Sequence, residues 1–520
     1  GGGGGGKFGR EGERAGGVRA FAPGRKDGSL EPGRERRLVT AALLLGMLLT
    51  AVEATAVGTA MPTAVAELGG VSRYSWVFSA YLLATTVTVP LFGKLADLYG
   101  RRRIYLVSVA IFLVGSALSG AARTLDQLIV YRAIQGVGAG GVAPVTVTVI
   151  GDIFSLRERG RMQGLFSGVW GLSSLLGPAL GGVMTEALSW RWVFYFNIPF
   201  GIVSAVLLGA FLRERRERRE HRLDVMGTVL LTAAVMLVMV VLLEGSEAWG
   251  WGSRRTLGVL AGAAVALGLF IWQESRTPEP MLPLSLFRNR LIAVANAGNA
   301  VIGALLFSAA AFVPMFAQGV LGGTAVHAGL TLAPVSVGWP IASVLSGRLL
   351  LRIGYRPLTV AGGAVGVAGA LLLTRLDPGS GIGAIMAIML LTGLGLGFMA
   401  TPYLVAVQSA VSWRQRGIVT SSVQFFRTIG GAIAIAVLGS VLNRHLRAEL
   451  GADANAILEP SLRAGLSAES LAETATALAG GLHAVFLAFA AAAVAAPCIA
   501  LLFPRGTAES HAVSEREAGV

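Results

Sequence analysis

The sequence predicts an all-α polytopic membrane protein with about fourteen transmembrane helices. Of its 520 residues, 54% are hydrophobic and only 14% are charged, and the mean hydropathy is +0.68. Soluble domains carry about 25% charged residues. One bilayer crossing needs about 20 apolar residues, so the apolar content suffices for about fourteen crossings. The 71 glycines are typical of membrane helices that pack closely.

Short polar breaks separate the apolar segments, and the segments have about the length of a bilayer crossing. They are too long for the strands of a membrane barrel, which run about ten residues. In chain order they cover residues 38–60, 75–96, 104–122, 127–150, 162–185, 193–212, 225–243, 256–273, 291–317, 327–351, 358–376, 382–411, 418–442 and 481–503.

Residues 1–37, before the first apolar segment, are rich in Gly and Arg and contain no apolar run. Such a composition buries too little apolar surface to fold, which predicts a disordered cytoplasmic tail. A signal peptide is not predicted, because the apolar segment that follows is long and lacks a cleavage site of small residues. The chain begins with glycines and no Met, so the true N-terminus stays open.

The positive charges are unevenly distributed between the two sides of the predicted bundle. The net charge is +14, and Lys and Arg concentrate in the tails and in every second connection. Cytoplasmic loops collect these residues, so the charge does not indicate nucleic acid. With an even number of spans, both termini are expected in the cytoplasm and the chain in the inner (plasma) membrane.

A twelve-span arrangement stays open as an alternative. In it, residues 225–273 would form interfacial helices, and 244–255 would remain at the cytoplasmic face. We favour two crossings, because 225–243 is uncharged and long enough for a hydrocarbon core of ~30 Å. The polar face of an interfacial helix is absent there.

An internal repeat divides the chain. GKLADLYGRRR at 93–103 is echoed by GRLLLRIGYR at 347–356, and GVGAG at 136–140 is echoed by GLGLG at 393–397. Internal repeats are typical of secondary transporters, which rock one half against the other around a site near the midplane. The repeat predicts a six-helix half at 38–213, two additional helices within 214–290, a second six-helix half at 291–503 and a cytoplasmic tail at 504–520.

Five motifs in chain order resemble those of the major facilitator superfamily, and within it the fourteen-span drug:proton antiporters of the EmrB/QacA type. The segment 93–103 is similar to the superfamily loop G-x-L-a-D-r-x-G-r-r. RAIQGVGAG at 132–140 is similar to R-x-x-q-G-x-g-a, and SSLLGPALGG at 173–182 to the antiporter motif g-x-x-x-G-P-x-x-G-G. WRWVFYFNIPFG at 190–201 and VEATAVGTAMP at 52–62 resemble signatures of the subfamily.

The resemblance implies the major facilitator fold and the export of hydrophobic drugs or antibiotics by alternating access. The proton gradient would supply the energy, with no cofactor, and the substrate would be small and hydrophobic, cationic or planar. Export of an endogenous metabolite, lipid or siderophore is the alternative in the same class. A non-transporting receptor or a channel is the alternative in another class. The oligomeric state, for which a monomer is compatible with the sequence, and the role of the outer loop 443–480 stay open.

An enzyme is not predicted from these residues. The sequence has no combination of nucleophile and base, no P-loop and no metal-ligand spacing among its five histidines. Its one cysteine, Cys498, allows no disulfide within the chain and no cysteine metal cluster.

Glu53 and Arg132 are charged residues inside predicted spans. An acid in a span is costly and by default marks the path of an ion or substrate. Glu53 stands where the subfamily has Asp, and for Arg132 the resemblance implies a part in proton transfer. The structural alternatives are an acid that reaches the outer surface or pairs with an arginine, and an arginine that clamps the first and fourth spans together.

The loop motif at 93–103 predicts a conformational latch. An aspartate near a helix end can accept hydrogen bonds from backbone amides and from arginines, which would lock one conformation. The alternative is that the arginines only follow the positive-inside rule. The second half has Leu351 at the place of the aspartate, so the latch is expected in the first half only. Its residues are Gly93, Asp97, Gly100, Arg101 and Arg102.

The motif at 173–182 predicts a break in the fifth span, since Pro removes a backbone hydrogen bond and Gly lets helices approach closely. The resemblance implies a hinge that also keeps the pathway free of leaks, and ordinary helix packing is the alternative. The residues are Gly177, Pro178, Gly181 and Gly182.

Polar and aromatic side chains near the middle of the spans are candidates for binding substrate. Aromatic faces suit cationic or planar ligands. Each candidate could instead hold helices together by hydrogen bonds. The candidates are Trp170, Asn296, Asn299, Trp339, Gln424 and Arg427.

Overall fold

The computed structural model describes residues 1–2, 33–68, 74–212, 224–244, 249–278, 280, 282–323, 325–450 and 468–504. The two predicted tails lie mostly outside these ranges. The basic segment 213–223, part of the segment 244–255 that separates twelve from fourteen spans, and part of the loop 443–480 also lie outside them.

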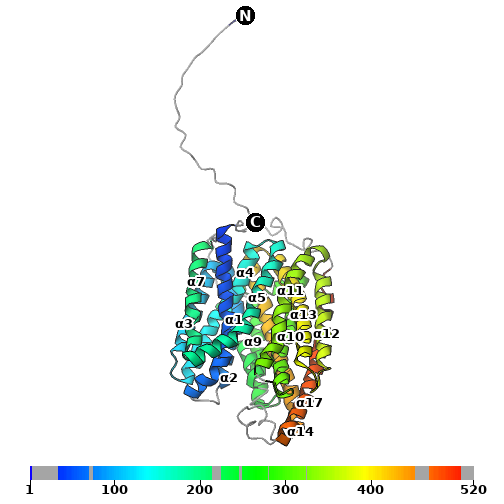
Figure 1. Cartoon of the computed structure of the whole chain (residues 1–520). Coiled ribbons are helices and arrows are strands. Elements are labelled where there is room, and N and C mark those ends of the chain that lie inside the picture. Colours follow the sequence, from blue (N-terminus) through cyan, green and yellow to red (C-terminus); the bar gives the residue numbers. More distant parts are fainter. Residues whose placement is uncertain are drawn as a thin grey trace.

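All regular structure in the described ranges is helical (Figure 1). The first half contains α1 (Arg34–Leu68), α2 (Tyr74–Tyr99), α3 (Arg101–Gly120), α4 (Leu125–Ile153), α5 (Leu156–Ala187), α6 (Trp192–Tyr195) and α7 (Asn197–Phe211). Helix α1 begins inside the stretch predicted as tail, because its first turn is anchored. Arg36 forms an ion pair of 3.0 Å with Glu158, and its guanidinium lies 5.0 Å from the centre of the Phe154 ring.

The remaining helices form a connecting pair and the second half. The connecting pair is α8 (Val225–Glu244) and α9 (Arg254–Glu274), which pack against each other. The second half contains η3 (Leu284–Arg288), α10 (Arg290–Gly319), α11 (Ala325–Ile353), α12 (Tyr355–Leu373), α13 (Ile382–Ser409), η4 (Trp413–Gln415), α14 (Arg416–Leu450), α17 (Ala468–Ala493) and α18 (Ala495–Leu501).

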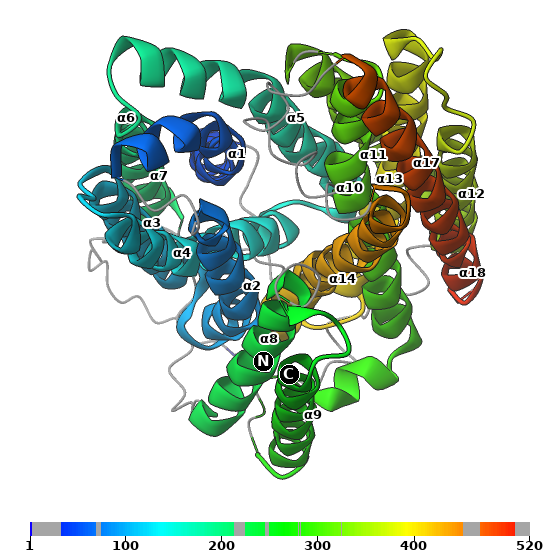
Figure 2. The same ribbon diagram turned by 90° about the horizontal axis from the view of Figure 1, so that it is seen from below.

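The helix packing of the first half reappears in the second. The contacts of α1 with α5, of α2 with α4 and of α3 with α4 correspond to those of α10 with α14, of α11 with α13 and of α12 with α13. Figure 2 shows the two groups side by side, with α8 and α9 at the edge of the bundle. Helix α8 contacts both α2 and α14, so the connecting pair lies over the boundary between the halves.

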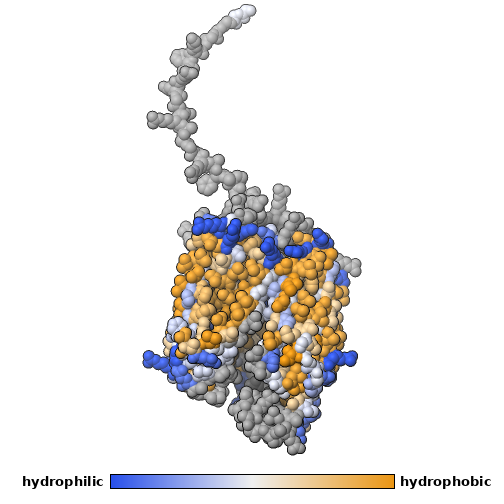
Figure 3. All heavy atoms as spheres, viewed as in Figure 1, coloured by the Kyte–Doolittle hydropathy of each residue, from blue (hydrophilic) through white to orange (hydrophobic). Residues whose placement is uncertain are grey.

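Thirteen helical stretches in the described residues are long and apolar enough to cross a membrane. Helix α5 is not among them, although it packs between α1 and α11. Its first turns carry several charges, and its remainder is rich in Gly and Ser, which lowers its hydropathy. On the face shown in Figure 3, an apolar belt lies between two hydrophilic rims, as a bilayer requires.

The two halves meet most closely near one end of the bundle, which we call the latch end. There α2, α4 and α13 terminate and α1, α5 and α14 begin. A Cβ atom added to Gly160 of α5 would overlap the Cα of Gly347 on α11, and one added to Gly93 of α2 would overlap Ser421 on α14. At the opposite end the surface is indented between the halves (Figure 3). The molecule is therefore closed at the latch end.

Candidate functional site

Glu53 lies at the centre of a buried polar network in the first half. Its side chain is 0% exposed, and it forms an ion pair with Arg132 of α4. Asn197, the first residue of α7, donates a hydrogen bond of 2.5 Å to the other carboxylate oxygen. The sequence allowed Glu53 to carry protons, to reach the outer surface or to pair with an arginine. In the structure it pairs with an arginine.

Further polar groups hold Arg132 in place. Its guanidinium donates to Gln135 at 2.8 Å and to the carbonyl of Val77 at 3.4 Å, and its central carbon lies 4.3 Å from the centre of the Tyr81 ring. Gln135 in turn donates to Ser116 of α3 at 3.2 Å. Arg132 therefore joins α1, α2 and α4, which is the clamp predicted as its structural alternative.

Asn197, Gln135 and Ser116 were missed as site residues. Asn197 and Ser116 are joined by a hydrogen bond of 3.1 Å, so the Glu53 network also includes α3 and α7. Two of the three lie in quoted motifs, Gln135 in RAIQGVGAG and Asn197 in WRWVFYFNIPFG. The available signal was a polar side chain inside an apolar run, which is expensive in a membrane unless it has a partner.

Outside the membrane-spanning stretches, the end of α1 is tied to the start of α6. Trp190 and Arg191 donate hydrogen bonds of 2.7 and 2.8 Å to the carboxylate of Glu67. These bonds, chiefly that from Arg191, lower the pKa of Glu67 below its usual value. The WRW motif thus fixes the ends of two helices of the first half.

At the latch end, Asp97 joins the two halves. Its carboxylate accepts hydrogen bonds from the backbone N–H groups of Gly417 at 2.9 Å and of Ile418 at 2.8 Å, in the first turn of α14. It also accepts one of 2.8 Å from Arg101. Gly100 between these two residues has a φ of +95°, a conformation that favours glycine, and it allows the sharp connection from α2 to α3.

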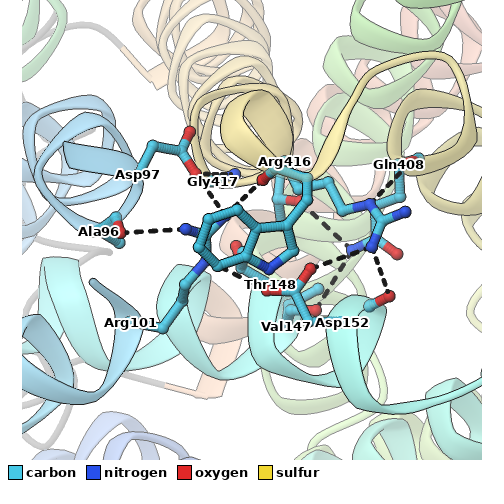
Figure 4. A network of polar contacts seen from close by, with 12 residues as sticks. Ala96, Asp97, Arg101, Val147, Thr148, Asp152, Gln408, Arg416 and Gly417 are labelled. Carbon is cyan, nitrogen blue, oxygen red and sulfur yellow. Dashed lines mark hydrogen bonds and ion pairs between the residues drawn. The ribbon is translucent and has the colours of Figure 1, made fainter. Parts of the chain in front are cut away.

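Arg101 extends this network to α4 and to the second half (Figure 4). It donates to Asp152 at 3.1 Å and to the carbonyl of Trp413 at 2.5 Å, and it lies over the Trp413 ring at 3.8 Å. Asp152 also accepts a hydrogen bond of 3.1 Å from Arg416 of α14. Asp97, Arg101, Asp152 and Arg416 together form what we call the latch network.

Of the residues predicted for the latch, Asp97 and Arg101 lie in the latch network. Gly93 packs against Ser421 at the boundary between the halves, and Gly100 forms the connection from α2 to α3. The side chain of Arg102, which was also predicted for the latch, is exposed. Asp152, Trp413 and Arg416 were not predicted, because they join Asp97 only through the fold.

The corresponding loop of the second half lacks this chemistry. Leu351 takes the place of Asp97, and a buried tyrosine, Tyr355, takes the place of Arg101. The loop of the second half approaches α5 through the glycine contact of Gly160 with Gly347 instead. The contact of α2 with α14 therefore contains charged groups, whereas α5 and α11 meet through close packing of their backbones.

The predicted break in the fifth span is not present. Helix α5 is continuous from Leu156 to Ala187, through Pro178. Neighbouring helices satisfy backbone groups near a proline in a membrane helix, and Thr55 of α1 donates a hydrogen bond of 2.9 Å to the carbonyl of Ser173. Gly177 and Gly181 press against α1 near Thr55 and Ala56, whereas Gly182 faces open space. In this conformation Gly177 and Gly181 serve ordinary helix packing, which was the alternative to a hinge. Motion about a hinge in α5 stays a prediction.

Within the described residues, the hydrogen bonds of the substrate candidates go to other residues and not to one another. Asn296 and Asn299 are each 1% exposed. Asn296 accepts a hydrogen bond of 3.1 Å from Ser422, and Asn299 donates one of 2.9 Å to the carbonyl of Ala295. The bond of Asn296 joins α10 to α14, which agrees with a role in holding helices together, whereas the bond of Asn299 stays within α10.

The other four candidates differ in exposure. Trp170 is 44% exposed and donates to the sulfur of Met47 at 3.3 Å. Trp339, Gln424 and Arg427 are partly buried. The indole nitrogen of Trp339 and the side-chain oxygen of Gln424 are buried without a hydrogen-bond partner among the described residues.

Two repeated helical halves, an apolar belt and a charge network that joins the halves at one end define a membrane transporter. The chain belongs to the major facilitator superfamily, whose family model matches residues 43–435. It is a transporter and not an enzyme.

The chain is similar to curated bacterial transporters over most of its length. It is 38% identical over 409 residues to the multidrug transporter protein MdtP of Bacillus subtilis, covering 79% of this chain and 76% of that protein. It is 35% identical over 405 residues to multidrug resistance protein 3 of the same organism, covering 78% and 79%. The crystal structure of the human organic anion transporter MFSD10 matches with a TM-score of 0.62 at 17% identity, covering 90% and 100%, which shows the fold alone.

Proposed function

We propose that the protein is a proton-coupled antiporter that exports small hydrophobic drugs or antibiotics by alternating access. The observation that carries the proposal is the Glu53–Arg132–Asn197 network. In this network the carboxylate of Glu53 lies within a membrane span, and it accepts hydrogen bonds from Arg132 and Asn197, which belong to other helices. The names of the two Bacillus relatives support the substrate class.

The mechanism follows from the competition between a proton and Arg132 for Glu53. When Glu53 is ionised, it attracts Arg132 and holds α1 against α4. When a proton binds, that attraction is lost, and the helices that contact Glu53 can adopt another arrangement. A proton and a substrate are coupled if each binds the two conformations with different affinity.

The latch network supplies the second element of alternating access. Its charges join the halves at the latch end, and the surface is indented at the opposite end. We assign the latch end to the cytoplasm, in agreement with the positive charges, and the molecule to an outward-facing conformation. With α5 counted as a crossing, the chain would have fourteen spans with both termini in the cytoplasm of the cell.

Export of an endogenous metabolite, lipid or siderophore remains the second candidate, because the same mechanism would serve any small hydrophobic substrate. A receptor or channel would need neither the coupled network nor the latch. The test is transport by the full chain in proteoliposomes with an imposed pH gradient, measured for a panel of compounds. Substrate movement that follows the gradient supports the proposal, and movement that is independent of it contradicts proton coupling.

A further inference from the structure

Arg427 is a positive charge in the first half of α14 that the latch and the Glu53 network do not use. It is the twelfth residue of the helix, about 16.5 Å from the first residue at 1.5 Å per residue. Its main chain is fixed at this depth, because a Cβ atom on Gly303 of α10 would overlap the Arg427 carbonyl. The side chain is partly exposed.

The side chain lies on the face of α14 that points to the other half of the molecule. Thr420, Gln424 and Arg427 follow each other at a spacing of four and three residues, which places them on one helix face. Thr420 accepts a hydrogen bond of 3.3 Å from Gln408, whose amide also donates to the carbonyl of Val147 on α4 at 3.2 Å. That face therefore adjoins the boundary between the halves, along which alternating access would move a substrate.

In the described part of the chain, no hydrogen bond or ion pair reaches the guanidinium of Arg427. The acids of the two networks described above already have partners. Glu53 is paired with Arg132, and Asp97 and Asp152 are paired with Arg101 and Arg416. An arginine within a membrane span is costly without a partner.

We propose that Arg427 recognises an anionic group of the substrate, and that the substrate class is an organic acid with an apolar body. The proposal rests on the proposed transport function and narrows its substrate class, from a hydrophobic compound in general to an acidic one. The planar guanidinium offers donors in a fork that matches a carboxylate. Gln424 lies one turn earlier on the same face, and its side-chain oxygen has no partner among the described residues. This oxygen could accept a hydrogen bond from a donor group of the ligand.

Equilibrium binding tests this assignment without any gradient. The probes are 1-pyrenebutyric acid and its primary amide, which share a body and differ in charge, and the protein is the purified full chain. The wild type should bind the acid about tenfold or more tightly than the amide. Arg427→Gln should remove this preference and leave binding of the amide unchanged, which also shows that the variant is folded. Arg427→Lys should retain part of the preference, because it keeps the charge without the fork.

The matched control is Arg375→Gln, which removes one positive charge from an exposed position after α12 and should leave the preference intact. Equal binding of acid and amide by the wild type, absence of acid binding, or a full preference in Arg427→Gln would overturn the assignment. Displacement of the acid by phosphatidylglycerol would identify a lipid headgroup as the source of the anion, and failure to displace it would identify a soluble acid.

Transport measurements separate this assignment from the function on which it rests. Gradient-driven export of the amide without preference for the acid would contradict the anion site and leave the antiporter standing. An acid preference that depends on Arg427, in a protein without gradient-driven transport, would contradict the antiporter and leave the site standing.

Discussion

Asp97 on α2 accepts a hydrogen bond of 2.9 Å from the backbone N–H of Gly417 on α14, across the boundary between the two halves. The amide of Ile418 adds a second bond of 2.8 Å to the other carboxylate oxygen. A carboxylate is stabilised at a helix N-terminus by the unpaired amides and by the helix dipole. Because acceptor and donors belong to different halves, this contact exists only while the latch end is closed.

Replacement of Asp97 by Asn should weaken closure and slow transport. An amide oxygen lacks the charge that strengthens bonds to the two backbone donors and to Arg101. Hydrogen bonds to a charged group contribute about 1.5–3 kcal/mol, so we expect turnover to fall about tenfold or more. The measurement is the initial rate of gradient-driven transport in proteoliposomes. Leu351→Asn, at the corresponding place in the second half, should have a milder effect, and equal losses would mean that the loops act only through packing.

Asp152 and Arg416 should be energetically coupled. Their ion pair of 3.1 Å joins α4 to α14, and Asp152 also binds Arg101 on its other oxygen. Residues in one charged network show interaction energies of about 0.5–3 kcal/mol. A double-mutant cycle with Asp152→Asn and Arg416→Gln, followed by thermal unfolding of the purified protein, measures this term. Additive effects of the two substitutions would rule out the coupling.

Gly160→Ala should disturb the second crossing between the halves. A Cβ atom at Gly160 would overlap the Cα of Gly347, and backbone atoms of a neighbouring helix have little freedom to move away. We expect reduced closure at the latch end and a loss of transport. Gly168→Ala on the same helix meets no atom within 4 Å and controls for the change in helix propensity. A Gly160 variant as active as the Gly168 variant would show that the contact is unimportant.

Asn197→Leu should uncouple protons from substrate without unfolding the protein. The substitution removes the amide that donates to Glu53 and to Ser116, so Glu53 keeps Arg132 as its main partner. The measurement is the ratio of protons to substrate moved in proteoliposomes, with an expected fall in coupled transport. Ser204→Ala on the same helix removes a separate buried hydrogen bond, to the carbonyl of Ala42. It should cost about 1 kcal/mol of stability and leave the ratio unchanged, and an identical effect of both variants would contradict a specific role of Asn197.

The sequence was sufficient for the elements that depend on local composition. Long apolar runs determined the membrane helices, and a charged residue inside such a run identified Glu53 and Arg132, because the cost of burial can be read from one position. The repeat predicted that the loops at Gly93 and Gly347 correspond, and both lie where the halves meet.

Partners that are distant in sequence could not be read in this way. Asp152 lies at the end of a helix, where an acid is unremarkable, and its role depends on Arg416, which is 264 residues away. The break expected at Pro178 was wrong, because the sequence motif does not reveal that α1 packs against α5 at this point. Asn296 and Asn299 were substrate candidates because of their polarity, with helix packing as the alternative, and the sequence could not show that they form hydrogen bonds within the protein.

The role of Glu53 is tested most directly by Glu53→Gln in proteoliposomes with an imposed pH gradient. Gln keeps the size of the side chain, and its one amide oxygen can still accept a bond from Arg132 or from Asn197, but it can neither bind nor release a proton in this range. We predict that the variant inserts and binds substrate but does not transport it against a concentration gradient, and that Glu53→Asp retains partial activity. Uphill transport by Glu53→Gln at the wild-type rate would contradict proton coupling through this residue.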